Sequence, residues 1–167
     1  MRVDPIGLAD SDEIALLIRT AFAAQSVPTD PPASALRVSG DDVRSHLTKG
    51  GGAAVRIDGV LAGCALWGPR DGGLYVGRVS VAPGFRRRGI ATALLEAAET
   101  AARHDGFPRL LLETRLVLRD NRALFAGLGF REVSLHAHPG YAHKTFVLME
   151  KPLPEPQDGM GSPNDRA

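Results

Sequence analysis

Apolar residues recur every three or four positions near the start of the chain: Ile14, Leu17, Ile18, Ala21 and Phe22. This spacing predicts a helix over residues 10–25, and Asp10 followed by Glu13 is typical of a capping box at its start. Three prolines within residues 28–32 then exclude a helix and indicate a loop. A second, short helix is expected after Ser39, because acidic residues in a first turn favour a helix start.

The period of the pattern changes from about residue 52. Apolar runs at 53–57 and 60–67 are separated by Asp58-Gly59, the two-residue turn of a β-hairpin. A further strand is predicted over 75–81. These segments indicate the antiparallel part of a sheet.

Helical spacing returns from Ile90 to about residue 103, and the next apolar run, Leu110-Leu111-Leu112, is typical of a strand buried on both faces. The strand-helix-strand unit over 75–114 makes this part of the sheet parallel. A short helix at 121–127, a strand from Phe130 and a final strand at 144–149 complete the pattern. The prediction is an α+β fold, a mixed sheet with helices on its faces.

One domain over residues 1–152 fits the length, and residues 153–167, which are poor in apolar side chains, are expected to form a disordered tail. The formal net charge of +1 argues against a nucleic-acid or anionic-membrane binder. The N-terminus has no signal-peptide pattern and no apolar run approaches about 20 residues, so a cytoplasmic protein is expected. Cys64, the only cysteine, lies in an apolar run and is expected in the core.

A phosphate-binding turn is predicted where the strand at 75–81 leads through Gly89 into a helix. Free backbone N–H groups at a helix start, together with the helix dipole, favour an anion there. Gly89 has no Cβ to block its approach, and the guanidinium groups of Arg86, Arg87 and Arg88 pair well with phosphate oxygens. The alternative is that Gly89 only eases the chain into the helix and the arginines are solvated.

The whole run from Val79 to Leu95 resembles motif A of the GNAT superfamily, the Gcn5-related N-acetyltransferases. It has the hydrophobic strand, the proline-containing turn, the Arg-x-x-Gly-x-Ala signature and the apolar helix in register. Residues 110–114, Ala123-Leu124-Phe125 and Leu128-Gly129-Phe130 look like motif B of the same family. The resemblance covers roughly residues 3–152.

The resemblance implies the GNAT fold: a mixed, mostly antiparallel sheet with helices on both faces, and a β-bulge that splays the strand at 79–81 from the strand at 110–114. It implies acetyl-CoA as co-substrate, no metal, and direct acetyl transfer to a primary amine of a small molecule or peptide. The pantetheine arm is expected on the backbone of Val79 and Val81. The residues implied to bind the cofactor are Val79, Ser80, Val81, Arg86, Arg87, Arg88, Gly89, Ile90, Ala91, Thr92, Asn121 and Phe125.

Glu113, at the end of the buried strand, is the first candidate for the base that deprotonates the amine; its alternative is a surface carboxylate or a partner for Arg115. Phe125 stands where many family members carry a tyrosine near the thioester sulfur, and it cannot donate a proton. Asn121 is displaced from the family's usual asparagine, so helix capping and ligand contact are both open.

The loop from Leu135 to His143 holds three histidines and is expected near the acceptor. His136 and His138 alternate and are expected on one strand face. His138 and Tyr141 are further candidates for acceptor recognition or base catalysis, the alternative being a plain polar loop. Because Phe125 departs from the pattern, the alternative function is a CoA-binding sensor with little or no catalysis. The resemblance also allows a homodimer through terminal strands, while the acceptor itself is not readable.

Overall fold

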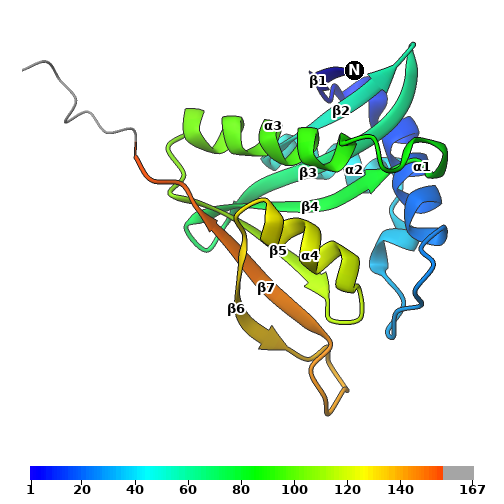
Figure 1. The fold of residues 1–167 in the computed structure, drawn as a ribbon. Coiled ribbons are helices and arrows are strands. Elements are labelled where there is room, and N and C mark those ends of the chain that lie inside the picture. Colours follow the sequence, from blue (N-terminus) through cyan, green and yellow to red (C-terminus); the bar gives the residue numbers. More distant parts are fainter. Residues whose placement is uncertain (156–167) are drawn as a thin grey trace, which may run out of the picture.

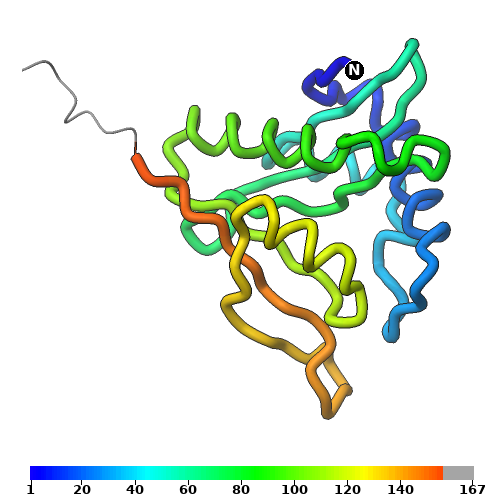
Figure 2. Tube along the Cα trace, viewed as in Figure 1, coloured from blue at the N-terminus to red at the C-terminus, as the bar shows by residue number. Residues whose placement is uncertain are grey.

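A computed structural model describes residues 1–155 and shows one seven-stranded sheet in the order β1-β2-β3-β4-β5-β7-β6 (Figures 1 and 2). The strands are β1 Arg2–Pro5, β2 Gly51–Ile57, β3 Val60–Arg70, β4 Gly73–Val81, β5 Arg109–Arg115, β6 Arg131–His136 and β7 Phe146–Pro152. The α-helices are α1 Ser11–Ala23, α2 Gly40–Lys49, α3 Ile90–His104 and α4 Arg119–Gly127. Only β4 and β5 pair in parallel, so the predicted mixed, mostly antiparallel sheet is confirmed.

Two Asp-Gly turns build the antiparallel half. Asp58 and Gly59 both have positive φ, 51° and 80°, which is the turn conformation that matches the twist of a β-hairpin. Asp71 and Gly72 repeat it with φ of 49° and 77° and join β3 to β4. Only the first of these turns was predicted, and β4 therefore begins at Gly73 instead of at the predicted Tyr75.

The helix starts follow capping chemistry in one case and depart from it in another. Ser39 caps α2: its hydroxyl accepts from the Asp42 N–H at 3.1 Å, and the Asp42 carboxylate accepts from the Ser39 N–H at 2.9 Å. Asp10 was expected to cap the first long helix. Its carboxylate instead accepts from the Gly7 N–H at 2.9 Å and closes a short 3-10 turn that precedes α1.

Helices cover both faces of the sheet, as predicted. In Figure 1, α3 and α4 lie on the near side, and α2 lies behind the sheet. Helices α1 and α2 pack on one buried cluster, which includes Ile14, Ile18 and Cys64, and α3 packs on the other around Leu94. Burial raises the pKa of the Cys64 thiol to about 12, and the prediction that Cys64 is a core residue is confirmed.

Strands β4 and β5 pair over only two positions, Leu74 with Leu110 and Tyr75 with Leu111, and then diverge (Figure 2). A bulge lies just beyond the paired positions, where the β3 register shifts and Arg78 has a φ of 54°. The splayed strand pair is therefore confirmed, with the bulge before Ser80 rather than over 79–81.

The strand β1, which pairs with β2, was not predicted. The last strand runs over Phe146–Pro152 instead of 144–149, and α4 begins at Arg119 instead of Asn121. Leu153 was assigned to the tail, but its side chain is buried and its N–H donates to the Pro108 carbonyl at 2.8 Å. Residues 156–167 of the predicted tail lie outside the described residues. No helix within residues 1–155 is long and apolar enough to cross a membrane.

Candidate functional site

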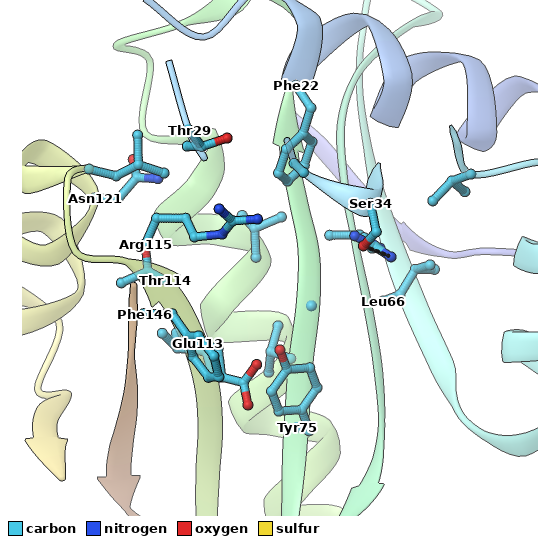
Figure 3. A pocket seen from close by; sticks show the side chains of 18 of the residues that line it. Phe22, Thr29, Ser34, Leu66, Tyr75, Glu113, Thr114, Arg115, Asn121 and Phe146 are labelled. Atoms are coloured by element: carbon cyan, nitrogen blue, oxygen red, sulfur yellow. Dashed lines mark hydrogen bonds between the residues drawn. The ribbon is translucent and has the colours of Figure 1, made fainter. Parts of the chain in front are cut away.

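A cleft of about 800 Å³ opens where β4 and β5 diverge. Residues 75–79 of β4 form one wall and residues 112–115 of β5 the other. Helices α1, α2 and α4, the segment around Ser34, strand β3 and the β6–β7 hairpin supply the remaining lining, and Figure 3 shows side chains from several of these elements around the space. The cleft is thus a direct consequence of the bulge, because a regular parallel pair would have closed it.

The turn before α3 is an open backbone cradle. Arg87 and Gly89 have positive φ, 64° and 76°, and the helix begins at Ile90. Within residues 1–155, the backbone N–H groups from Gly89 to Thr92, at the start of α3, have no hydrogen-bond acceptor. A Cβ placed on Gly89 would meet no atom within 4 Å. Unpaired donors, open space and a helix N-terminus together make a site for an anion such as a phosphate.

The three arginines of the cradle have different surroundings. Arg86 donates to the carbonyls of Ala21 at 3.2 Å and Ala24 at 3.5 Å, so its guanidinium caps the C-terminus of α1 instead of remaining free for phosphate. Arg88 stacks on the Phe85 ring, 5.2 Å from its centre, and Arg87 is exposed. The positive charge left for an anion therefore comes from Arg87 and Arg88.

Of the predicted pantetheine residues, Val79 lines the cleft. The Ser80 side chain is buried and its hydroxyl donates to the Arg78 carbonyl at 2.9 Å, so it is not available to a ligand, and Ser80 pairs with Cys64 of β3. Val81 pairs with Gly63 of β3. Ile90 is buried in the core, so it can contribute only its backbone, whereas Ala91 and Thr92 are half-buried.

Glu113 lies at the deep end of the cleft and pairs with Arg70 at 2.9 Å, not with Arg115. Arg70 also stacks on the Tyr75 ring at 4.5 Å. Figure 3 shows the Glu113 carboxylate and the Tyr75 hydroxyl facing each other. Burial, followed by the Glu113 charge, raises the pKa of Tyr75 to about 12, so this phenol stays protonated at neutral pH.

His138 lines the cleft from the hairpin side. Its Nδ1 and its backbone N–H both contact the Thr145 hydroxyl. Burial and the positive charge of Arg115 lower its pKa, although Glu113 acts in the opposite direction. The His136 and His138 rings both pack on Phe146, at 5.2 and 4.9 Å. Because β6 ends at His136, His138 does not lie on a strand face with it, and that prediction is wrong.

Tyr141 is outside the cleft lining. Its hydroxyl donates to Asp30 at 2.6 Å, and this bond is the main cause that raises the pKa of Tyr141. Arg115 donates to the Pro31 carbonyl at 2.5 Å. The proline-rich loop is therefore held beside the cleft by β5 and by the hairpin. Tyr141 takes part in holding this loop and does not face the cavity.

Asn121 and Phe125 both line the cleft from α4, as predicted for ligand contact, and Phe125 packs edge-on against Phe130 at 6.1 Å. Arg78 was missed by the sequence analysis. Its half-buried side chain enters the cleft from the bulge and donates to the Ser34 hydroxyl at 3.0 Å. Only the bulge directs it there, and no local sequence signal marks that bulge.

The model of the Acetyltransferase (GNAT) family matches residues 19–130. No curated protein matches the chain. Among solved structures, the ribosomal-protein-S18-alanine N-acetyltransferase of Escherichia coli is 18% identical, with 94% of this chain and 96% of that chain covered and a TM-score of 0.75.

The PaiA N-acetyltransferase of Thermoplasma acidophilum in complex with coenzyme A is 15% identical, with 92% and 100% covered and a TM-score of 0.73. A GNAT family acetyltransferase of Elizabethkingia anophelis with acetyl-CoA bound is 18% identical, with 91% and 97% covered and a TM-score of 0.61. These likenesses show that the fold is shared.

Proposed function

Because the chain belongs to the acetyltransferase (GNAT) family, we propose that it transfers the acetyl group of acetyl-CoA directly to a primary amine of a small molecule or peptide. One observation carries the proposal: a single segment, 75–92, forms both a wall of the cleft and the anion cradle. Acetyl-CoA joins a diphosphate to a long neutral arm that ends in a thioester. The diphosphate fits the cradle, and the arm and thioester fit the adjoining cleft.

The backbone N–H groups from Arg87 to Thr92 would hold the diphosphate, supported by the charges of Arg87 and Arg88. The pantetheine arm would lie along β4, on the exposed backbone groups of Val79 and Val81 that β5 leaves unpaired after the splay. The cleft volume of about 800 Å³ is within the usual range for ligand pockets and leaves space for an acceptor beside the arm.

The acceptor amine attacks the thioester carbonyl, the carbon–sulfur bond breaks, and CoA leaves as a thiolate. A backbone N–H near Val79 would stabilise the developing oxyanion. The amine must lose a proton and the thiolate must gain one. Tyr75, still protonated because its pKa is raised to about 12, is a donor that Phe125 cannot be.

Two side chains of the cleft can accept the proton of the amine: Glu113, held by Arg70, and His138, held by Thr145. Because the pKa of His138 is lowered from its ordinary value of 6.5, the imidazole is mainly neutral, and able to accept a proton, at pH values between the lowered pKa and 6.5 as well as above them. If His138 is the base, the acidic limb of the kcat/KM profile lies below pH 6.5 and disappears in His138→Gln. If Glu113 is the base, Glu113→Gln removes that limb and His138→Gln keeps it.

The alternative function is a CoA-binding sensor, and the observation in its favour is Phe125 in place of a proton-donating tyrosine. Acetyl-CoA consumption and acetyl-CoA affinity, measured with the same amine panel, separate the two functions. Amine-dependent release of the CoA thiol supports the enzyme. Tight acetyl-CoA binding with release at the uncatalysed rate for every amine supports the sensor and overturns the proposal.

A further inference from the structure

Two guanidinium groups enter the cleft from opposite walls, Arg78 from β4 and Arg115 from β5. Both reach toward the same segment: Arg78 donates to the Ser34 hydroxyl at 3.0 Å, and Arg115 donates to the Pro31 carbonyl at 2.5 Å. In Figure 3, Arg115 points from β5 toward β4, and Ser34, the partner of Arg78, lies on the other side of β4 in that view.

Neither guanidinium has a carboxylate partner within residues 1–155. Asp42 acts on Arg78, and Asp30 on Arg115, through charge alone and without a direct ion pair. Each of these carboxylates has its own hydrogen-bond partner, Ser39 for Asp42 and Tyr141 for Asp30, and Glu113 pairs with Arg70. The lone contacts of Arg78 and Arg115 are thus to neutral oxygens.

Each guanidinium also keeps most of its hydrogen-bonding capacity. An arginine side chain has five N–H donors, and the described contacts use one in Arg78 and one in Arg115. In the described part of the chain, the only fully buried side-chain nitrogen without a partner belongs to Arg109, so the free nitrogens of Arg78 and Arg115 are not fully buried and remain accessible. Burial lowers the pKa of both guanidiniums, a sign that they are partly desolvated without full compensation.

The location of the two arginines separates them from the cradle. Ala35 and Val38, which flank the Ser34 contact, belong to the buried cluster under α1 and α2, whereas α3 packs on the opposite cluster. The donor's diphosphate at the start of α3 and the ligand of Arg78 and Arg115 would therefore approach the cleft from different faces of the sheet. An anion bound by these arginines would therefore belong to the acceptor.

We propose that the acceptor is an amino acid, or a small amine of the same type, whose carboxylate is held between Arg78 and Arg115 while its amine faces the thioester. This inference rests on the proposed acetyltransferase function. Planar carboxylates match the guanidinium fork, and pairing would supply the direct carboxylate partner that the two arginines lack. Strong recognition of a carboxylate also implies strong rejection of the same amine without it, because the arginines would then stay unpaired.

The test compares kcat/KM for acetyl-CoA-dependent acetylation across matched acceptors: free α-amino acids, their carboxamides, the corresponding decarboxylated amines, and an amine carrying a phosphomonoester. We expect the free acids to exceed the amides by at least about tenfold, the usual minimum for hydrogen bonds to a charged group. Arg78→Gln and Arg115→Gln each lower kcat/KM for the acids to near that of the amides and leave the amides within about twofold.

Arg115→Lys keeps the charge but loses the fork, so it should retain part of the preference. Arg131→Gln, an exposed arginine on β6, is the control for a lost positive charge and should behave as wild type. Acetyl-CoA affinity, measured by calorimetry for each variant, reports whether the protein is folded and the cradle intact.

Equal turnover of acids and amides overturns the carboxylate proposal and leaves the acetyltransferase function standing. A clear preference for the phosphomonoester also overturns it, in favour of a phosphorylated amine. Absence of turnover with every acceptor, while acetyl-CoA still binds, overturns the proposed function itself.

Discussion

Gly89→Glu places a carboxylate in the cradle at the start of α3. A Cβ at this position meets nothing within 4 Å, so the side chain has space and does not disturb packing. The backbone φ of 76° does carry a cost, since a non-glycine residue in this left-handed region is strained by roughly 1–2 kcal/mol. For a chain of this size that corresponds to a fall in Tm of roughly 2–8 °C.

Gly106→Glu is the matched control. Gly106 is exposed, has a φ of 77° and also has nothing within 4 Å of an added Cβ. It follows the other end of the 15-residue helix α3, about 22 Å away. Both variants thus carry the same strain and the same charge. The helix dipole favours the acid only at the N-terminus, so Gly89→Glu should be the more stable of the two.

The two variants should differ sharply in their affinity for acetyl-CoA. A unit charge about 5 Å from another costs about 3 kcal/mol at an effective dielectric constant near 20, and solvent screening reduces this to about 1–2 kcal/mol per phosphate charge. With two phosphate groups near the new carboxylate, the total cost is about 2–4 kcal/mol, so the affinity for acetyl-CoA should fall roughly 30- to 900-fold in Gly89→Glu. Gly106→Glu should stay within about twofold of wild type.

Isothermal titration calorimetry with acetyl-CoA at low and at high salt measures the affinity of each variant and its salt dependence. Thermal melts are the folding control. The loss in Gly89→Glu should shrink as salt rises, since it is electrostatic. Equal affinities of the two variants would refute the assignment of the cradle to the diphosphate.

Three further outcomes follow from individual contacts. Arg86→Ala should lower Tm by exposing the last carbonyls of α1 and leave acetyl-CoA affinity nearly unchanged. Arg87→Ala should instead weaken acetyl-CoA binding, reduce the salt dependence of that binding and leave Tm unchanged. The reverse pattern would contradict the structural role of Arg86 and the phosphate-binding role of Arg87. Burial alone would raise the pKa of Glu99, but hydrogen bonds from Lys151 and Arg103 outweigh it and hold this pKa below its ordinary value of 4.5. The stabilisation is therefore present above pH 4.5 and lost as pH falls through the lowered value, so Glu99→Gln should lower the free energy of unfolding at pH 7 and show a smaller further loss near pH 3. Cys64, buried and with its pKa raised to about 12, should resist thiol reagents at pH 8 until the protein is unfolded, and rapid labelling of the native protein would contradict its position in the core.

The elements that the sequence predicted well have strong local signals. Asp58-Gly59 needs no tertiary context to form a turn, and α3 ends at His104, just before Gly106, whose left-handed conformation is typical of a helix end. Strand β1 has no such signal: it is four residues long, mostly exposed and at the sheet edge, so its pairing with β2 depends on the rest of the fold. Leu153 was missed for the same reason, since a single apolar residue among prolines shows no period.

The cradle could be predicted because its chemistry resides in one continuous segment. The cleft could not, because its walls come from segments far apart in the chain. Glu113 pairs with Arg70, 43 residues earlier, and Tyr141 bonds to Asp30 across 111 residues. Arg78 is directed into the cleft by a backbone φ of 54° that no local pattern encodes.

The most direct test of the central claim is to incubate the protein with acetyl-CoA and amine acceptors, identify the product by mass spectrometry and measure release of the CoA thiol. Wild type and Gly106→Glu are expected to yield an N-acetylated amine and one CoA thiol per product, and Gly89→Glu little of either at low acetyl-CoA concentration. Thiol release at the uncatalysed rate with every amine, from a protein that binds acetyl-CoA, would contradict the claim.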